Sequence, residues 1–159
     1  SEDKVELAVE AQDIKAKLIS AVDEDTRAFN DYLEALRMPK KTDEEKEARR
    51  RAIQDGLKTA VAVPLRTAEL SLRALELAGQ IAETGNRPSV SDAGVGAQIA
   101  HTGVIGGTLN VLINLGDIDD EEFIREMENK CDELRSRATK KLREALETTE
   151  RRISEMRKK

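Results

Sequence analysis

Residues 91–115 read SDAGVGAQIAHTGVIGGTLNVLINL, and this stretch decides the fold. It is apolar enough to be buried, yet it contains five glycines, two asparagines and one aspartate. Each glycine inside a helix costs on the order of 1 kcal/mol relative to alanine. We therefore expect a helix whose backbone is approached closely, either by a neighbouring helix or by a ligand.

The polar residues of this stretch share one side of the expected helix. We expect Ser91 to cap a helix that continues to Leu115. In this helix Asn110 and Asn114 lie one turn apart. Asp92 precedes Asn110 by eighteen residues, or five turns, so it points the same way. The glycines on or near this side are Gly96, Gly103 and Gly107. The opposite side is apolar and carries Ile99, Val104 or Ile105, Leu109 and Leu112.

Two explanations of this composition remain open. Small residues alone favour the packing of one helix against another. Buried amides need hydrogen-bond partners or cost about 1–3 kcal/mol each, so a groove that holds a flat, hydrogen-bonding ligand explains both features. A symmetric contact between two copies explains them less well and stays as the alternative.

The overall composition indicates packed helices. The chain has 159 residues, of which 37% are charged and 38% are apolar, with two Phe, one Tyr and no Trp. Ala, Leu, Ile and Val supply most of the apolar residues, which suits helices better than a sandwich or barrel. The net charge of −5 disfavours nucleic acid and acidic membranes. No apolar run is expected to span a bilayer and no signal peptide is recognised, so we expect a cytoplasmic protein with no membrane partner.

The residues that precede the central stretch predict two further helices. Apolar residues from Val5 to Leu36 recur at intervals of three, four or seven, which is typical of an amphipathic helix. Pro39 ends this helix, because the residue before a proline is pushed out of the helical region. Thr42 and Glu45 have the spacing of a capping box, so a second helix should start near Asp43.

The second helix is expected to run through Ala60 and to be kinked or interrupted at Pro64, which lacks a backbone donor. The apolar pattern resumes after this proline and stops near Gly85. We expect Gly85 to be a left-handed cap and Pro88 to be a stop signal.

The C-terminal part of the sequence predicts one long charged helix. Asp119 and Glu122 have capping-box spacing at its start, and it should be roughly 60 Å long. Because the terminal helices carry apolar stripes with little to cover them, we expect a dimer or a higher homo-oligomer. The predicted fold is all-α, an elongated bundle of four or five helices in one domain, residues 1–159.

Other patterns in the sequence give little indication of chemistry. Gly94 and Gly96 lack the third glycine and the preceding strand of a dinucleotide-binding turn. His101 is the only histidine, and a lone histidine is more often structural than catalytic. Cys131 is the only cysteine, so it forms no internal disulfide and no metal cluster. We therefore predict no metal and no cofactor.

Two segments, residues 23–65 and 85–123, resemble the cyclodeaminase domain of formiminotransferase-cyclodeaminase. The resemblance covers roughly residues 19–123, and the combination of its motifs is specific although each alone is weak. The family pattern is carried by Asp25, Ala28-Phe29, Tyr32, Glu34-Ala35, Met38-Pro39-Lys40, Glu45-Lys46, Arg49, Val63-Pro64-Leu65, Gly85-Asn86, Ser91-Asp92 and the run from Asn110 to Leu115.

This resemblance implies an enzyme of one-carbon metabolism and histidine degradation, a lyase-type cyclodeaminase that needs neither metal nor nucleotide. Cyclodeaminases convert 5-formiminotetrahydrofolate to 5,10-methenyltetrahydrofolate and release ammonia. A related branch hydrolyses the methenyl bridge as a cyclohydrolase, which is the alternative. A formiminotransferase domain or protein is the implied partner. A non-enzymatic helical assembly or folate-binding module is the second alternative.

Six residues are our candidates for the folate site. We expect Asp92 to transfer a proton or to hold the pterin edge, because it is the one carboxylate on the small-residue side. Asn110 and Asn114 can each donate and accept, as the mixed edge of a pterin requires. The other substrate-binding candidates are Tyr32, Asn86 and Lys40, the last for the negatively charged glutamate tail.

Members of this family usually begin with a further helix and a segment like Pro-Gly-Gly-Gly-Ser. This sequence starts after the place where both are expected. Either it belongs to a longer chain, or the site has been lost or is built differently.

Overall fold

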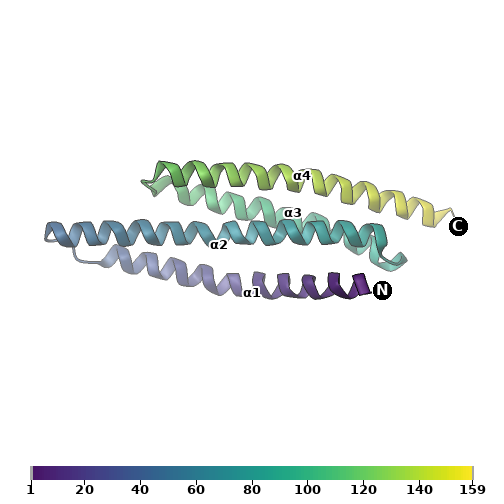
Figure 1. Cartoon of the computed structure of the whole chain (residues 1–159), viewed down its shortest axis with the longest axis horizontal. Coiled ribbons are helices and arrows are strands. Elements are labelled where there is room, and N and C mark those ends of the chain that lie inside the picture. Colours follow the sequence, from purple (N-terminus) through teal and green to yellow (C-terminus); the bar gives the residue numbers. More distant parts are fainter. Residues whose placement is uncertain (1, 159) are drawn as a thin grey trace.

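The structure is a computed structural model that describes residues 2–158, with side chains from Lys4 onward. Within these residues it contains four α-helices, one short 3-10 helix and no strand. The helices are α1 (Glu2–Arg37), α2 (Asp43–Thr84), α3 (Arg87–Asn114) and α4 (Glu121–Arg157), and the 3-10 helix is η1 (Leu115–Asp117). The predicted all-α, elongated bundle is therefore confirmed, with four long helices running up and down beside one another (Figure 1).

The helix α2 lies at the centre of this arrangement. It contacts α1, α3 and α4, while α3 also contacts α4 and lies behind α2 and α4 in Figure 1. The main core joins α2, α3 and α4, and its largest fully buried side chains include Leu75, Val61, Val104 and Val111. By contrast, α1 buries mainly small side chains. It is therefore a peripheral helix, packed chiefly on α2.

The corner between α1 and α2 is held by the expected capping box. The backbone N–H of Glu45 donates to the Thr42 hydroxyl at 3.1 Å, and the Glu45 carboxylate accepts from the Thr42 N–H at 3.2 Å. Arg49 donates two hydrogen bonds to the carbonyl oxygen of Leu36, at 3.1 and 3.3 Å, near the end of α1. These bonds explain why the motif residues of this corner occur together, because they satisfy the free backbone groups of both helix ends.

Of the kink or interruption expected at Pro64, the interruption is wrong, because α2 continues without a break from Asp43 to Thr84. Pro64 is buried, and its carbonyl oxygen faces Gly107 of α3. A Cβ added at Gly107 would lie only 2.7 Å from this oxygen. One missing backbone donor weakens the helix only locally, whereas packing against α3 stabilises both sides of the proline.

The boundary between α2 and α3 also differs from the prediction. Gly85 is not left-handed, since its φ and ψ are −67° and 161°. Asn86, and not Ser91, caps α3, because its side chain accepts from the Ser89 N–H at 3.1 Å. Pro88 therefore lies in the first turn of α3, where a missing N–H costs nothing. It marks a helix start, and the expectation of a stop signal is wrong.

The start of α4 is shifted by one residue from the prediction. Asp120 caps the helix by accepting from the Phe123 N–H at 3.0 Å. Asp119, the predicted cap, instead pairs with Arg50 of α2 at 2.8 Å. The sequence offers two consecutive aspartates here, and the tertiary ion pair decides which of them caps the helix.

The segment Arg87–Asp117, comprising α3 and η1, is long and apolar enough to cross a membrane by length and composition, with a mean hydropathy of 1.2. The expectation that no segment would meet this criterion is wrong. One such helix is weak evidence for a membrane, because the core helix of a soluble protein can pass the same test.

Candidate functional site

The glycines of α3 fall into two groups. A Cβ at Gly94 would lie 2.8 Å from the Thr149 side chain of α4. A Cβ at Gly107 would lie 2.7 Å from the Pro64 carbonyl oxygen, and Gly103 faces Ser71 as closely. These three glycines are explained by helix packing, because each allows α3 to approach a neighbour.

The second group has no such explanation within the chain. A Cβ at Gly96 or at Gly106 would meet nothing within 4 Å. Both glycines lie on the side of α3 that α2 and α4 leave open, and neither is buried. Part of the glycine content of α3 therefore serves the core, and part belongs to an exposed surface.

The predicted polar residues of α3 lie on this open surface. Asp92 and Asn110 are exposed and Asn114 is half-buried, so the expectation that they are buried in the core is wrong. The Asn110 amide donates to the Gly106 carbonyl at 3.2 Å, and the Asn114 amide donates to the Asn110 carbonyl at 2.9 Å. Each bond uses one N–H donor and leaves the remaining amide donor and the oxygen for water or a ligand.

The apolar side of α3 is also different from the prediction. Ile99 and Leu109 were placed with Val104 on the side opposite Asp92, but they are 68% and 57% exposed, whereas Val104 is fully buried. Ile99 follows Asp92 by seven residues, almost two whole turns, so it lies on the same side as Asp92. In addition, α3 is apolar around most of its circumference. The period of its hydrophobic residues therefore does not identify the buried side.

The six candidate residues do not form one cluster within the chain. Asp92 and Asn110 share one side of α3 but are separated by eighteen residues, about 27 Å along the axis. Lys40 and Asn86 lie just beyond opposite ends of α2, whose 42 residues span about 63 Å. One bound pterin cannot touch both members of either pair in a single copy.

Tyr32 is in the half of the molecule that contains Asn110 and Asn114. It is partly buried against the core, and a Cβ at Gly56 would lie 3.3 Å from its Cα. Gly56 therefore allows α1 to approach α2 at this level. Asn86 is in the other half with Asp92, and its side-chain oxygen accepts from the Ser89 N–H and hydroxyl at 3.1 and 2.6 Å.

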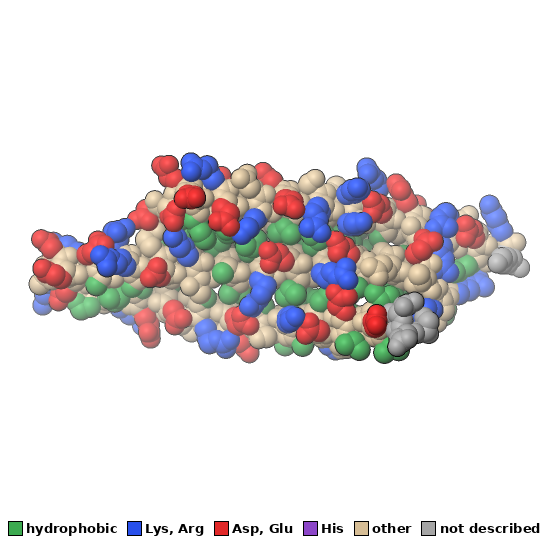
Figure 2. Space-filling model, in the orientation of Figure 1, with side chains coloured by type: hydrophobic (Ala, Val, Ile, Leu, Met, Phe, Trp, Pro, Cys, Tyr) green, Lys and Arg blue, Asp and Glu red, His purple; other side chains and the backbone are tan. Residues whose placement is uncertain are grey.

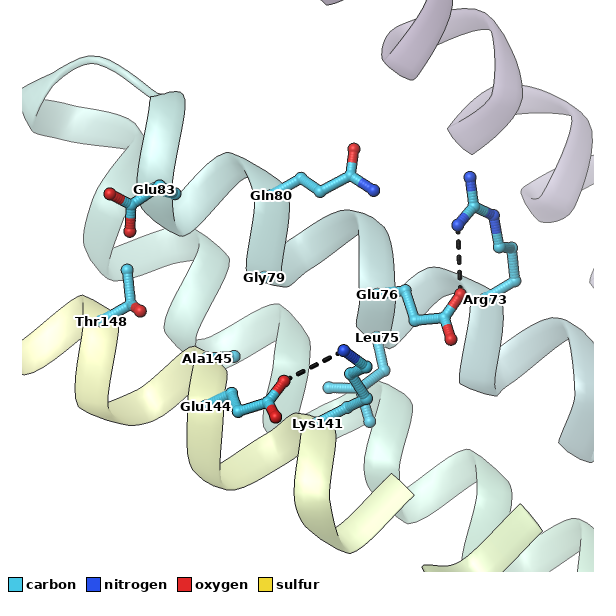
Figure 3. A pocket seen from close by; sticks show the side chains of 10 residues that line it. All are labelled: Arg73, Leu75, Glu76, Gly79, Gln80, Glu83, Lys141, Glu144, Ala145 and Thr148. Carbon is cyan, nitrogen blue, oxygen red and sulfur yellow. Dashed lines mark hydrogen bonds and ion pairs between the residues drawn. The ribbon is translucent and has the colours of Figure 1, made fainter. Parts of the chain in front are cut away.

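A polar hollow of about 480 Å³ lies between α2 and α4 (Figure 3). Its charged side chains are paired with one another, as in the bonds of Glu76 to Arg73 and of Glu144 to Lys141, at 3.1 and 3.0 Å. Glu76 also pairs with Arg137 at 3.1 Å. Because these charges neutralise each other, the hollow offers a ligand few unpaired groups.

An apolar groove lies between α1 and α2 and reaches α3 at one end. Its volume is about 290 Å³, and it includes Ile14 of α1, Leu77 of α2 and Ala93 of α3. An adjoining shallower hollow shares Ile14 and continues along α1 to Val22. The groove thus runs beside the start of α3, close to Asp92 in the sequence, and is suited to apolar groups.

A further network, which the sequence analysis missed, fixes the end of α3. The Gln54 side chain donates to the Asp117 carbonyl and accepts from the Asp119 N–H, both at 3.0 Å. Lys58 pairs with Asp120 at 2.7 Å; this hydrogen bond raises the pKa of Lys58 and lowers that of Asp120. The spacing of Gln54 and Lys58, one turn apart opposite an acidic turn, was the available signal.

Among the described residues, no three His, Cys, Asp or Glu side chains gather closely enough to hold a metal ion. The arrangement that the structure does provide is an exposed helix face with amides, two open glycines and Asp92 as its one carboxylate. Such a face can bind a flat ligand through backbone contact and hydrogen bonds.

These features define an all-helical cyclodeaminase-like bundle. The sequence profile of the family described as Formiminotransferase-cyclodeaminase matches residues 1–133. The chain belongs to this family.

Similarity to individual proteins extends over most of the chain. It is 44% identical over 119 residues to formimidoyltransferase-cyclodeaminase of Sus scrofa, covering 75% of this chain and 22% of that protein. It is 38% identical over 116 residues to methenyltetrahydrofolate cyclohydrolase of Methylorubrum extorquens, covering 73% of this chain and 56% of that protein. The chain thus spans about a fifth of the animal relative and about half of the bacterial one.

The fold is also similar to a solved structure. The crystal structure of formiminotetrahydrofolate cyclodeaminase from Thermotoga maritima matches with a TM-score of 0.75 at 25% identity. The match covers 89% of this chain and 67% of that one.

Proposed function

We propose that the protein acts on a one-carbon derivative of tetrahydrofolate, as a formiminotetrahydrofolate cyclodeaminase. The family match over residues 1–133 and the names of its relatives support a cyclodeaminase or a cyclohydrolase. The observation that carries the proposal is the exposed outer face of α3, whose amides and open glycines fit a flat, hydrogen-bonding pterin.

The reaction needs only proton transfer and positioning. A folate nitrogen attacks the formimino carbon and forms the second C–N bond of the methenyl bridge, while the bond from that carbon to the departing nitrogen breaks. The attacking nitrogen loses one proton, and the formimino N–H gains two, that proton and one from solvent, so it leaves as ammonia and the methenyl bridge is left as a cation. Asp92 is the carboxylate on the outer face of α3 and is proposed to carry this proton. Asn110 and Asn114 are proposed to orient the pterin. Because they lie about 27 Å or more from Asp92 in one copy, the proposal requires that a second copy of the chain brings them to the same substrate.

Cyclohydrolase activity is the second candidate, because a relative with that name covers 73% of the chain. The two reactions are separated by the absorbance of the methenyl product. Its appearance from 5-formiminotetrahydrofolate supports the cyclodeaminase. Its enzyme-accelerated disappearance, with no reaction of the formimino substrate, supports the cyclohydrolase.

Binding is tested by titration calorimetry with 5-formyltetrahydrofolate, a stable analogue. We expect Asn110→Leu to weaken binding at least tenfold, because it removes a donor and an acceptor from the proposed site. Gln98→Leu is the matched control, since Gln98 is an exposed amide of α3 away from the polar side. Equal affinity of Asn110→Leu and wild type would contradict the site. Absence of binding by the wild-type protein would favour a non-enzymatic assembly module.

The animal relatives carry a formimidoyltransferase name together with the cyclodeaminase name. We propose that a transferase domain or protein supplies the formimino substrate to this one. Lys40, exposed at the corner between α1 and α2, stays the proposed contact for the glutamate tail.

A further inference from the structure

The helix α4 mixes acidic and basic side chains along most of its length, with one exception. Residues 134–143 contain five Lys or Arg and no Asp or Glu, although the chain as a whole carries a net charge of −5. This basic stretch begins directly after residue 133, where the family match ends. The family match therefore does not explain why these basic side chains are gathered here.

Three of the five basic side chains line a shallow hollow on the surface of α4, which we call the basic hollow. Its volume is about 430 Å³, and α4 alone supplies its lining, which is Arg135, Ser136, Thr139, Lys140 and Arg143. Arg135, Thr139 and Arg143 are four residues apart, as are Ser136 and Lys140. The five side chains therefore form two adjacent rows on one face of the helix, with Thr139 one turn from both arginines.

Carboxylates do not neutralise the positive charges of the basic hollow. Among the described residues, no carboxylate oxygen lies within 4.0 Å, the limit of an ion pair, of the Arg135 or Arg143 guanidinium. Lys140 reaches Glu144 only at 4.0 Å, and Glu144 lies closer to Lys141, at 3.0 Å. The hollow thus gathers three positive charges with one weak pair among them.

A buried hydroxyl holds the guanidinium of Arg135 in place. The Arg135 Nε–H donates to the Thr108 hydroxyl of α3 at 2.8 Å, and that hydroxyl donates to the Ile105 carbonyl at 2.9 Å. Thr108 is fully buried, so these bonds fix the inner edge of the guanidinium. Its two Nη groups make no hydrogen bond within the described part of the chain. Their four N–H donors are therefore available to a ligand in the hollow.

Arg143 supplies the second guanidinium. It lies eight residues from Arg135, about 12 Å along the helix axis. Side chains on a helix lean toward its N-terminus, and for Arg143 this direction is toward Thr139 and Arg135. Arg143 donates no hydrogen bond to any described residue, so it can turn onto an anion that lies above Thr139. Lys140 flanks the same position from the neighbouring row.

We propose that the basic hollow binds the phosphate group of a small, soluble phosphate monoester. Such a group carries a charge of about −1.5 to −2 at pH 7 and has three acceptor oxygens. Two guanidiniums, one ammonium and the Ser136 hydroxyl supply donors for all three oxygens. A carboxylate has a single charge and two oxygens, so it matches the three cations less well.

The surroundings of the basic hollow favour a small ligand over a membrane or a nucleic acid. The preceding part of α4, residues 121–133, contains six acidic and two basic side chains, and Glu147 follows the hollow. An extended polyanion would lie against these carboxylates and be repelled, as it would by the net charge of −5. A single phosphate group fits between the two acidic parts of α4.

Nuclear magnetic resonance of ¹⁵N-labelled protein tests the site, with glycerol 3-phosphate as the probe. At low salt we expect saturable shifts of the Arg135 and Arg143 Nε–H signals, with a dissociation constant of about 1 mM. Arg143→Gln should weaken binding at least tenfold, because it removes charge-assisted hydrogen bonds. Arg135→Gln should do the same. Arg125→Gln is the matched control, since Arg125 is exposed on α4 outside the hollow and its substitution removes the same charge.

A second titration tests the chemical class of the ligand. Glutarate, a dicarboxylate, should bind at least tenfold more weakly than glycerol 3-phosphate, because its charges lie on two separate groups. The affinity for glycerol 3-phosphate should rise between about pH 5 and 7, because the second pKa of a phosphate monoester is about 6. Equal affinities for the two probes, or an equal loss in Arg125→Gln, would show unspecific charge attraction and overturn the proposal.

Three further outcomes would also overturn it. These are the absence of saturable shifts, an affinity that Arg143→Gln leaves unchanged, and flotation of the protein with phosphatidic acid vesicles without binding of the soluble probe. The phosphate site does not rest on the proposed folate reaction, so 5-formyltetrahydrofolate should leave the Arg143 signal unshifted. Displacement of glycerol 3-phosphate by this folate would overturn a separate phosphate site, whereas failure of folate binding alone would leave it intact.

Discussion

The helices α3 and α4 both pack on α2, but their outer faces differ in the side chains that they expose. Along α4, Lys and Arg alternate with Asp and Glu over the surface (Figure 2), and several form pairs one turn apart, such as Lys130 with Glu126. The outer face of α3 has no such pairs and exposes Ile99 and Ile113 by 68% and 77%. Water solvates the charged outer face of α4, whereas the exposed apolar side chains of α3 are suited to a ligand or another protein surface. We therefore expect the chemistry to lie on α3.

The largest expected effect concerns catalysis. Asp92→Asn keeps the size of the side chain but removes its titratable group, so the full-length protein should lose about 10²–10⁴ in rate. Glu144→Gln in α4 is the comparison, because its partner is Lys141 and no substrate contact is proposed for it. Methenyl absorbance with the formimino substrate measures both. A wild-type rate for Asp92→Asn would refute the catalytic assignment, and equal losses in both variants would remove the contrast between the helices.

The second prediction compares two adjacent glycines of α3. Gly107→Ala should destabilise the fold by about 1–3 kcal/mol, because the new Cβ would lie 2.7 Å from the Pro64 carbonyl and 2.9 Å from the Ala68 N–H. Gly106→Ala meets nothing within 4 Å and should stabilise the monomer by up to about 1 kcal/mol. Urea unfolding measures both. Changes of the same sign would show that the two glycines do not differ as described.

The third prediction compares the caps of the two helices. Asn86→Ala should cost about 1 kcal/mol, because it removes the side-chain oxygen that accepts from the Ser89 N–H and hydroxyl, and leaves only the Asn86 carbonyl for that N–H. Asp120→Ala removes the cap of α4 and also the ion pair with Lys58, so its cost should be larger, about 1–2 kcal/mol. Thermal unfolding ranks the two variants. A larger loss for Asn86→Ala would contradict the importance assigned to the network at the start of α4.

The smallest expected effect concerns acid. Pairing with Lys141 lowers the pKa of Glu144, and hydrogen bonds from Arg50 and Arg51 lower that of Glu47 to about 2. Carboxyls with a lowered folded pKa stabilise the fold above their ordinary pKa of 4.5, and they lose this contribution as the pH falls toward their folded pKa. After correction for the pH dependence of intrinsic amide exchange, protection should therefore fall more in the parts of α2 and α4 that carry these pairs than in the uncharged part of α3 between pH 4.5 and 2. An equal fall would mean that these exposed pairs contribute nothing.

Local signals in the sequence predicted the helices well, and tertiary contacts decided what was missed. The Thr42–Glu45 capping box was found because both partners lie within one turn. The unbroken helix at Pro64 was missed because packing against Gly107 compensates for the lost donor. The caps were misplaced where adjacent polar residues compete, as Asp119 and Asp120 do.

The sequence predicted which side of α3 carries the candidate residues, but not how far apart they lie along the helix. Helical periodicity correctly indicates that Asp92 and Asn110 share one side of α3, but it is silent on whether five turns of separation suit one ligand. It also could not show that this side is exposed, because Ile99 and Val104 look equally apolar in the sequence. Only the positions of α2 and α4 distinguish them.

Hydrogen–deuterium exchange with and without 5-formyltetrahydrofolate tests most directly whether α3 is the functional face. The backbone amides of residues 92–114 in α3 should exchange more slowly at saturating ligand, because a bound pterin stabilises this helix and restricts its local opening. The α2–α4 hollow, residues 73–83 and 141–148, should be unaffected. Protection confined to that hollow, or no protection at saturating ligand, would contradict the account.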